Sequence, residues 1–222
     1  MFSNQELDNF QFDEDDIKLQ IPSGGLIAGQ ATSGKSVLSY KIFKYADKIF
    51  TPKPKSKLYA YGIYNELVPK IKKLGVLTLP GLPSDEIIDK LEKPALIVLD
   101  DLMIEANEKY LNPLYTRSIH HKNLCVFHNV QNIFDKNLVV ARKNSQYFFL
   151  MRSPTGALDR RNFAAQNFPG QKEYFDEAFN EATKEKFSYL FANFHPKSDP
   201  ALKLMTNIFP GEDHIAFIPK NG

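Results

Sequence analysis

The stretch Leu26–Tyr40, which reads LIAGQATSGKSVLSY, constrains the fold more than any other part of the chain. Residues 29–36 fit the pattern G-x-x-x-x-G-K-[ST], the apolar segment 25–29 precedes them, and apolar residues at helical spacing follow them. A strand, a glycine-containing loop and a helix in this order form a phosphate-binding loop, in which backbone N–H groups and the positive end of the helix face phosphate oxygens. The alternative is a strand-to-helix turn that binds nothing, and the complete set of anchor residues argues against it.

The motif of the loop predicts which of its residues contact the nucleotide and the metal ion. We expect Lys35 to bridge the β- and γ-phosphates of ATP and Ser36 to ligate Mg²⁺. The sequence therefore predicts ATP and Mg²⁺ as cofactors. The expected nucleotide contacts are Gly29, Gln30, Ala31, Thr32, Ser33, Gly34, Lys35, Ser36 and Val37.

The segment PALIVLDDL, residues 94–102, supplies a second motif. A buried apolar strand that ends in Asp100 and Asp101 would deliver both carboxylates to the carboxyl edge of a parallel sheet, where such sheets bind ligands. We expect Asp100 to hold Mg²⁺ through its water shell and Asp101 to polarise the attacking water. This second role usually belongs to a glutamate, and the shorter aspartate reaches less far. A carboxylate next to the Mg²⁺ ligand favours an NTPase with its own catalytic base over a nucleotide kinase or a small GTPase.

The apolar segment LCVFHNV ends at Gln131 and Asn132. If this strand lies between the two motif strands, Gln131 reaches the γ-phosphate as a polar sensor. The alternative is that both residues are ordinary polar residues at the end of a strand. His128, which lies inside the same segment, is expected to be packed or hydrogen-bonded there.

Strand-like and helix-like segments alternate along the chain, which predicts an α/β protein with a mainly parallel central sheet and helices on both faces. The expected strands are 25–29, 57–62, 95–100, 124–129, 146–151 and 188–194. The expected helices are 34–45, 84–93 with Ser84 as its N-cap, 112–121, 157–168 and 172–186. We expect a flexible acidic segment at 1–16 and one P-loop ATPase domain at 17–222, with a C-terminal extension after about residue 194.

Charge and cysteine content indicate which kind of partner and which redox compartment suit the protein. Residues 1–16 carry six acidic side chains and no basic one, so residues 17–222 hold 28 basic and 20 acidic side chains. This excess suits a polyanionic partner, although a lysine-rich solvated surface gives the same charge. A single cysteine, Cys125, excludes an intramolecular disulfide and predicts a reducing compartment. We expect no secretory signal and no membrane segment, since the longest apolar runs are far too short to cross a bilayer.

Six segments carry a resemblance that spans about Phe12 to Glu212. They are GQATSGKS, YGIYNEL, GLP before LIVLDDLM, TRSIHHKNLCVFHNVQNIF, YFFLMRSPTGALDRRNFAAQNFPG and YLFANFHPKSDPALKLMTNIFPGE. Together they resemble the FtsK–HerA superfamily, and within it the genome-packaging ATPases of double-stranded DNA viruses. The likeness is to the adintovirus, polinton and virophage type, which is related to the poxvirus packaging ATPase. The later segments are more specific to this family than the P-loop is.

The resemblance implies a P-loop NTPase of the additional-strand class that drives double-stranded viral DNA into a capsid without reading its sequence. It implies a homo-oligomeric ring, a pentamer or a hexamer, with capsid or portal vertex proteins as partners. The expected location is the virion or the assembly site inside the host cell. Carried over by residue, the resemblance assigns nucleotide and Mg²⁺ to Gly29, Gly34, Lys35 and Ser36, the second motif to Asp100 and Asp101, and the sensor to Gln131.

Arginine is where the chain departs from the family pattern. A ring motor needs a cation from the neighbouring subunit, because negative charge grows on the phosphoryl oxygens during transfer. The family reads like NPRD after its last core strand, whereas this chain reads SPTG, with Thr155 in place of the arginine. The late segment likewise has Lys203 and Met205 in LKLMTNIFP, where the family reads like LRLRTNIFP. The nearest candidates for the catalytic cation are Arg152, Arg160 and Arg161, with Arg117 behind them.

Three other functions remain open at the level of sequence. A cellular or plasmid DNA translocase of the same superfamily usually carries membrane segments or accessory domains. A small-molecule phosphotransferase needs an arginine-rich lid, which five scattered arginines supply poorly. A nucleotide-binding assembly protein with little turnover is compatible with Asp101 and with the missing arginines, and an assay of turnover separates it from a motor.

Overall fold

The computed structural model describes residues 7–10, 17–153 and 156–219, and for residues 7–10 the backbone only. Thr155 and most of the acidic segment 1–16 lie outside the described residues. In the part that is described, no helix combines the length and the apolar composition needed to span a bilayer.

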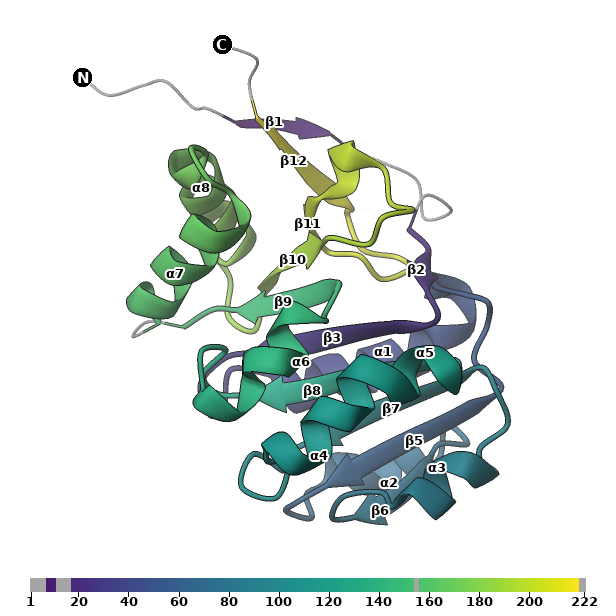
Figure 1. Ribbon diagram of the computed structural model, residues 1–222. Helices are drawn as coiled ribbons and strands as arrows, with labels where there is room; N and C mark the ends of the chain where they lie inside the picture. The colour runs from purple at the N-terminus through teal and green to yellow at the C-terminus, as the bar shows by residue number, and fades with distance from the viewer. Residues whose placement is uncertain (1–6, 11–16, 154–155, 220–222) are drawn as a thin grey trace, which may run out of the picture.

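Ten of the described strands form one sheet in the order β1-β12-β11-β10-β9-β3-β8-β7-β5-β6 (Figure 1). Six neighbouring strands run parallel to one another: β9 (Tyr147–Met151), β3 (Ser23–Ala28), β8 (Leu124–Val130), β7 (Ala95–Asp100), β5 (Ser56–Tyr61) and β6 (Leu77–Pro80). Four antiparallel strands continue the sheet beyond β9: β10 (Tyr189–Asn193), β11 (Leu204–Thr206), β12 (Ile215–Pro219) and β1 (Leu7–Phe10). The short strands β2 (Leu19–Gln20) and β4 (Phe50–Thr51) pair separately.

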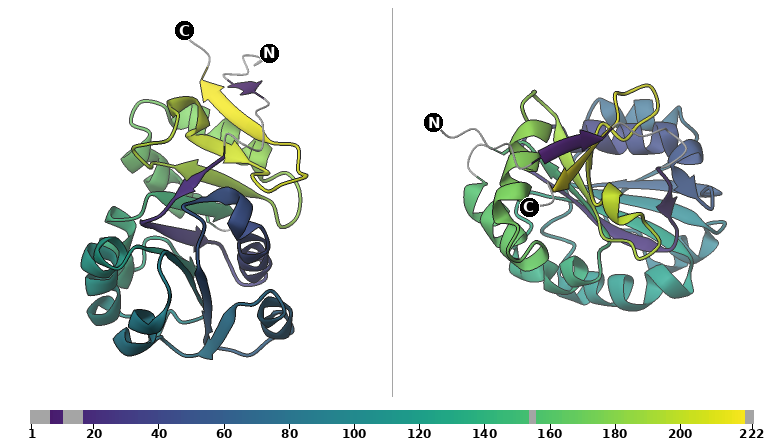
Figure 2. Two further views of the ribbon diagram at one scale, coloured as in Figure 1. Left: turned by 90° about the vertical axis from the view of Figure 1, so that its right-hand side faces the viewer. Right: turned by 90° about the horizontal axis from the view of Figure 1, so that it is seen from above.

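Helices cover both faces of the sheet, and the left-hand view of Figure 2 shows the two helical layers with the sheet between them. Residues of α1 (Lys35–Ile49) and α2 (Leu67–Lys72) pack in one apolar core. The opposite core is formed with α3 (Asp85–Lys90), α4 (Glu108–Pro113), the π-helix η2 (Leu114–Ser118), α5 (Ile119–His121), α6 (Val139–Lys143), α7 (Ala157–Asn167) and α8 (Lys172–Ala182). Two 3-10 turns, η3 (Lys136–Leu138) and η4 (Pro200–Leu202), complete the described elements.

The apolar patterns explain these elements. Strands β7 and β8 are buried at every residue, as expected for parallel strands covered on both faces. Helix α1 buries Leu38, Ile42, Phe43 and Ala46, which recur at the spacing of one helix face. The predicted fold class is therefore confirmed, as are all six predicted strands and the five predicted helices, within a few residues at their ends. Ser84 caps α3 as predicted, since its side chain accepts a hydrogen bond from the Ile87 N–H.

Short elements at the margins were not predicted. They include α2, β6, α6 and the strands of the antiparallel part of the sheet beyond β10. The residues after 194, which the sequence assigns to a C-terminal extension, contribute β11 and β12 to the main sheet, and β12 pairs with β1 from the other end of the chain.

His128 lies on β8 and is fully buried, as predicted for a packed histidine. Neither ring nitrogen has a hydrogen-bond partner among the described residues, and burial lowers the pKa of His128 to about 4. Below its unfolded pKa, the histidine carries a proton in the unfolded chain. Because the buried histidine is neutral, folding must release that proton, and this costs free energy. Its contribution to stability is complete above about pH 6.5 and is lost as the pH falls towards 4.

We therefore expect His128→Leu to reduce the acid sensitivity of folding. The wild-type free energy of unfolding should fall by about 3 kcal/mol more than that of the variant between pH 6.5 and pH 4. Urea unfolding followed by circular dichroism at several pH values measures this difference. Equal slopes for wild type and His128→Leu would show that His128 does not titrate as described.

Candidate nucleotide-binding site

The phosphate-binding loop joins β3 to α1 at the edge where the parallel strands end. Gly34 has φ 101°, a left-handed conformation that favours glycine. Gly29 donates its N–H to the Val130 carbonyl on β8 at 3.0 Å. A Cβ at Gly29 would lie 2.5 Å from Ser33 Oγ and 2.6 Å from Met151 Cβ, so a side chain does not fit there. Both glycines of the motif are thus required by the geometry of the loop.

The loop ends at the N-terminus of α1, a 15-residue helix. The first N–H groups of a helix lack partners within it and carry the positive end of the helix dipole. Ser33 Oγ is buried and has no hydrogen-bond partner among the described residues. A phosphate group seated on the loop would satisfy these donors, so the residues fit a nucleotide phosphate.

Lys35 is the cation of the loop. Its ammonium donates to the carbonyl oxygens of Gly29 at 2.6 Å and Gln30 at 2.8 Å. An ammonium has three N–H donors, so one remains for a phosphate oxygen. Burial lowers the pKa of Lys35, and the carboxylates of Asp100 and Asp101 partly offset this effect. The two motifs that lie far apart in the sequence therefore meet at this lysine.

Asp100 is held in a fixed orientation at the end of β7. It is buried, the Tyr59 hydroxyl donates to its Oδ2, and the Asn129 amide donates to its Oδ1 at 2.8 Å. The same amide donates to Ser39 Oγ on α1 at 3.0 Å. Burial and the neighbouring Asp100 raise the pKa of Tyr59 far above its usual range, so its hydroxyl stays protonated.

The oxygen donors around Asp100 suit Mg²⁺. Each carboxylate oxygen accepts one hydrogen bond from the described residues and keeps a lone pair for a water of the ion's shell. The Tyr59 hydroxyl also interacts with the side chain of Ser36, which brings Ser36 and Asp100 to the same place. Carboxylate and hydroxyl oxygens are ligands that Mg²⁺ prefers.

Asp101 follows β7 with φ 54°, a left-handed conformation, and its side chain is exposed. The end of β5 fixes this conformation. The Gly62 N–H donates to the Asp100 carbonyl at 2.9 Å, and a Cβ at Gly62 would lie 2.0 Å from the Asp101 carbonyl oxygen. Only glycine at position 62 allows this approach, so Gly62 positions Asp101.

We expect Gly62→Ala to lower the rate of ATP hydrolysis by about 10²-fold, because the added methyl group must displace the backbone of Asp101. Steady-state hydrolysis measured beside thermal unfolding separates this effect from a loss of folded protein. Gly75→Ala is the matched control: Gly75 has φ 77° with open space around it, so its variant should lose only about 1 kcal/mol of stability. Wild-type turnover in Gly62→Ala would contradict the positioning role.

Gln131 comes directly after β8, and β8 lies between β3 and β7. Because the Gly29 N–H bonds the Val130 carbonyl, Gln131 lies beside the start of the loop. Gln131 and Gly29 line one pocket together with Met151, Ser153 and Arg160. The strand order required for the predicted sensor is therefore present.

Two of the candidate arginines are held within their own chain. The Arg152 guanidinium donates to the Lys184 carbonyl at 3.0 Å. Arg160 pairs with Asp176 on α8 at 3.1 Å and lies over the ring of Phe179. These bonds fix the turn after α8 and the packing of α7 on α8.

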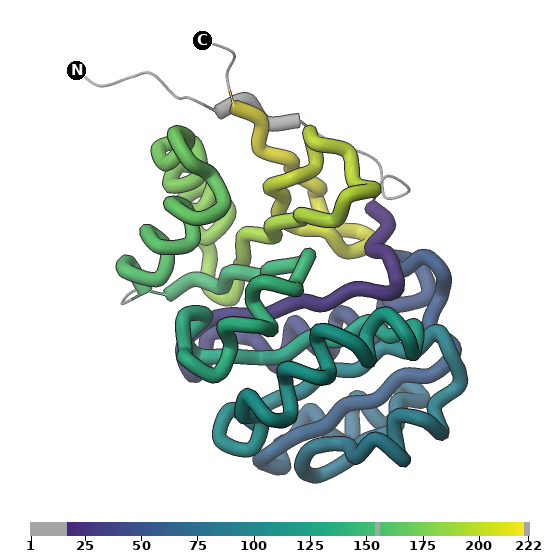
Figure 3. The backbone as a smooth tube through the Cα atoms, viewed as in Figure 1, coloured from purple at the N-terminus to yellow at the C-terminus, as the bar shows by residue number. Residues whose placement is uncertain are grey.

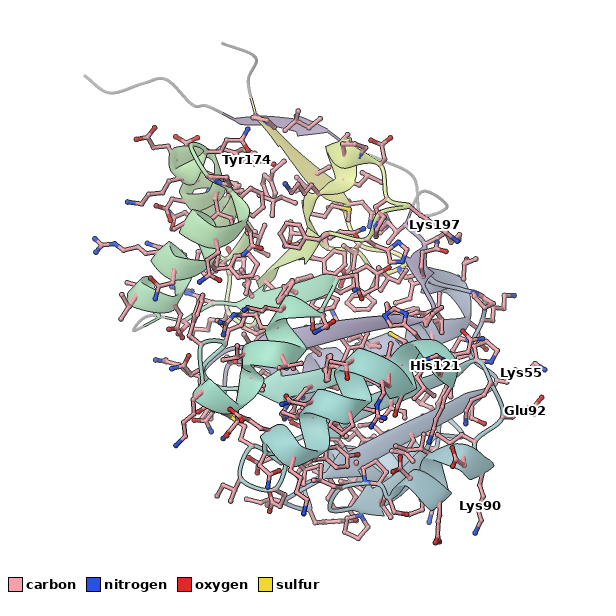
Figure 4. The ribbon with its side chains drawn as sticks, in the orientation of Figure 1. Lys55, Lys90, Glu92, His121, Tyr174 and Lys197 are labelled. Atoms are coloured by element: carbon pink, nitrogen blue, oxygen red, sulfur yellow. The ribbon has the colours of Figure 1, made fainter. Side chains whose placement is uncertain are left out.

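The other two candidates are exposed. Arg161 lies on α7, near the loop edge of the sheet, and makes no ion pair or hydrogen bond with another described residue. Arg117 lies on η2, one turn before His121, and α5 leads into the start of β8, at the opposite edge of the sheet, so Figure 4 shows His121 on the same side of the molecule as Lys55 and Glu92. Arg117 is therefore far from the loop of its own chain.

Sequence reasoning did not find the residues that orient Asp100 and Asp101, namely Tyr59, Asn129, Ser39 and Gly62. One signal was available. Asn129 and His128 are the two polar side chains of a mostly apolar strand, and a buried amide needs hydrogen-bond partners.

Comparison with solved structures places this fold. No protein-family model and no curated protein sequence matches the chain. The genome packaging NTPase B204 of Sulfolobus turreted icosahedral virus 2, in complex with ATP-gammaS, superposes with a TM-score of 0.50 and 12% identity, over 78% of this chain and 93% of that chain. The same NTPase in complex with sulfate gives a TM-score of 0.48 and 12% identity, over 82% and 93%. The first likeness confirms the P-loop NTPase fold that the sequence predicts.

Proposed function

We propose that this protein is an ATP-driven motor that packages double-stranded DNA into a viral capsid. The observation that carries the proposal is the meeting of Lys35, Asp100 and Gln131 at the loop edge of a sheet in which β8 separates the two motif strands. The resemblance of the later sequence segments to packaging ATPases supports the choice of DNA packaging among P-loop functions. So does the fold shared with B204, described as a genome packaging NTPase.

Each residue of the site has a part in hydrolysis. The N–H groups of the loop and the Lys35 ammonium bind the phosphates, and Ser36 and Asp100 would hold Mg²⁺, which would supply positive charge to the phosphate oxygens. Asp101 accepts a proton from the attacking water, and Gln131 contacts the γ-phosphate. Tyr59 and Asn129 keep the Asp100 carboxylate aimed at the site.

The subunits form a ring, a pentamer or a hexamer, in which a neighbour supplies the cation for the transition state. Arg161 is the candidate we favour, because Arg152 and Arg160 are engaged within their own chain whereas Arg161 is exposed and makes no bond to another described residue. The ring encircles duplex DNA and contacts its phosphates, which carry no sequence information. Capsid or portal vertex proteins are the other partners, in the virion or at the assembly site in the host cell.

Hydrolysis of ATP measured against protein concentration, with and without linear duplex DNA, tests this function. A ring motor should show turnover per subunit that rises with concentration, because sites complete only on assembly, and that rises again with DNA. Turnover that depends on neither would exclude the motor. Absence of turnover under all conditions would favour a nucleotide-binding assembly protein.

We expect Asp101→Asn to lower kcat by about 10²- to 10⁴-fold, the range for loss of a general base. Asparagine tolerates the left-handed conformation of residue 101, so the backbone should remain in place. Binding of a slowly hydrolysed ATP analogue, measured by calorimetry, should change little. Asp85→Asn, at an exposed carboxylate on α3, is the control for charge removal. A wild-type kcat in Asp101→Asn would assign the base to another residue.

A further inference from the structure

Phe187 combines two unusual properties. It is a large apolar side chain that is 63% exposed, and its backbone has φ 64°. A bulky residue in the left-handed region is a strained outlier, and such strain persists where the surrounding structure over-determines it. Neither property helps Phe187 to stabilise the core.

The turn that carries Phe187 is held by three hydrogen bonds. The Arg152 guanidinium donates to the Lys184 carbonyl at 3.0 Å, and the Arg152 N–H donates to the Ser188 carbonyl at 3.2 Å. Ser188 Oγ donates to the Glu185 carbonyl at 2.6 Å. Arg152, the residue directly after β9, thus fixes both ends of the turn, and the ring of Phe187 is presented in one place.

That place is the phosphate-binding loop. The Cβ and Cδ1 atoms of Phe187 lie 3.2 Å from the position that a Cβ on Gly34 would occupy, directly before Lys35. Figure 3 traces the chain from the end of α8 into β10, where it passes beside the end of β9. An exposed aromatic ring therefore stands against the backbone of the loop.

The strand order gives the direction of a bound nucleotide. The residues for Mg²⁺ and the γ-phosphate, Asp100 and Gln131, lie on the β8 side of β3. Phe187 lies on the other side of β3, since it precedes β10 and β10 pairs with β9. A triphosphate whose terminal end points towards β8 directs its nucleoside towards β9 and β10.

We propose that Phe187 is the platform on which the base of the nucleotide stacks. Every nucleobase has a flat π-face, so an exposed ring binds purines without a hydrogen-bond code. The inference rests on the proposed function, since it requires that a nucleoside triphosphate occupies the loop. The triphosphate is held by the loop and the base by Phe187, and the two contributions are separable.

Calorimetric titration with ATP-gammaS and with inorganic tripolyphosphate separates them. Phe187→Asn keeps a residue that tolerates the left-handed turn and removes the ring. It should weaken binding of ATP-gammaS by roughly 5- to 100-fold, the range for loss of one base–aromatic stack, and leave tripolyphosphate binding unchanged. Phe187→Tyr should bind both as the wild type does. Equal affinity of wild type and Phe187→Asn for ATP-gammaS would overturn the stacking role, whereas a wild type that binds neither ligand would overturn the proposed function.

A fluorescence experiment tests the same contact without a loss of affinity. The chain contains no tryptophan, so Phe187→Trp creates the only tryptophan, at the proposed platform, and excitation at wavelengths that its ten tyrosines do not absorb isolates its emission. ATP-gammaS should quench this emission, and tripolyphosphate should not. Leu77→Trp, at a residue that is 51% exposed at the start of the outermost strand β6, should respond to neither. Equal responses of Phe187→Trp to both ligands would show that the ring reports on the loop and not on a base.

Discussion

Replacing Lys35 with alanine is expected to reduce ATP hydrolysis below detection and to weaken binding of ATP and of inorganic tripolyphosphate together. The ammonium lies among the loop carbonyls and between the two motifs, where its charge acts at short range in a partly buried site. Its removal takes away the loop's own cation and leaves the carboxylates of Asp100 and Asp101 facing the incoming phosphates. Like charges at this distance oppose binding as well as the chemical step.

Lys41→Ala is the matched control for this prediction. Lys41 lies on the same helix, and its ammonium pairs with Glu212 at 2.6 Å on the surface. A partly exposed pair of this kind contributes less than about 1 kcal/mol. We therefore expect wild-type hydrolysis from Lys41→Ala, measured by phosphate release at saturating ATP. Measurable turnover in Lys35→Ala, above that of a mock purification, would mean that another site hydrolyses the nucleotide.

Sequence patterns predicted five of the six parallel strands and the adjoining β10, because these segments are mostly apolar, whereas β6, none of whose residues is buried, was missed. β7 and β8 could be read in this way from their residues alone. The antiparallel strands beyond β10 escaped prediction for a physical reason. β11 has three residues, and its partner β12 is only partly buried, so neither carries a periodic pattern that outweighs the surrounding loop residues.

In the candidate site, too, some residues could be predicted from the sequence and others could not. Lys35, Ser36, Asp100 and Asp101 were predicted because each belongs to a local motif with a fixed spacing. Their supports could not be predicted, because they depend on which strands become neighbours. Gly62 matters only because β5 pairs with β7, which brings it against the carbonyl of Asp101.

Arg161 is the residue for which the geometry changes the interpretation of the sequence. Its neighbour Arg160 is bonded to Asp176 on α8, so releasing it would break the packing of α7 on α8. Arg161 carries no such role among the described residues, and its exposure on α7 allows it to reach another subunit. If it does so, Arg161→Ala should lower kcat by about 10³-fold or more, the effect of removing an arginine finger. Nucleotide binding and folding should be unaffected.

Mixing two inactive variants distinguishes a cation supplied by a neighbour from one that acts within its own chain. In a ring each contact joins two different faces, so an Arg161→Ala subunit can offer an intact Lys35 to a Lys35→Ala neighbour that offers an intact Arg161. If the variants assemble at random, about a quarter of the contacts are then complete, and hydrolysis should reappear in an equal mixture. A mixture that stays inactive although the subunits co-assemble would place the action of Arg161 within its own chain. Arg161→Ala with wild-type turnover would place Arg161 outside the transition state and would leave Arg117 as the remaining candidate that makes no bond to another described residue. Recovery of activity would show both that the site lies between subunits and that its cation is supplied from α7.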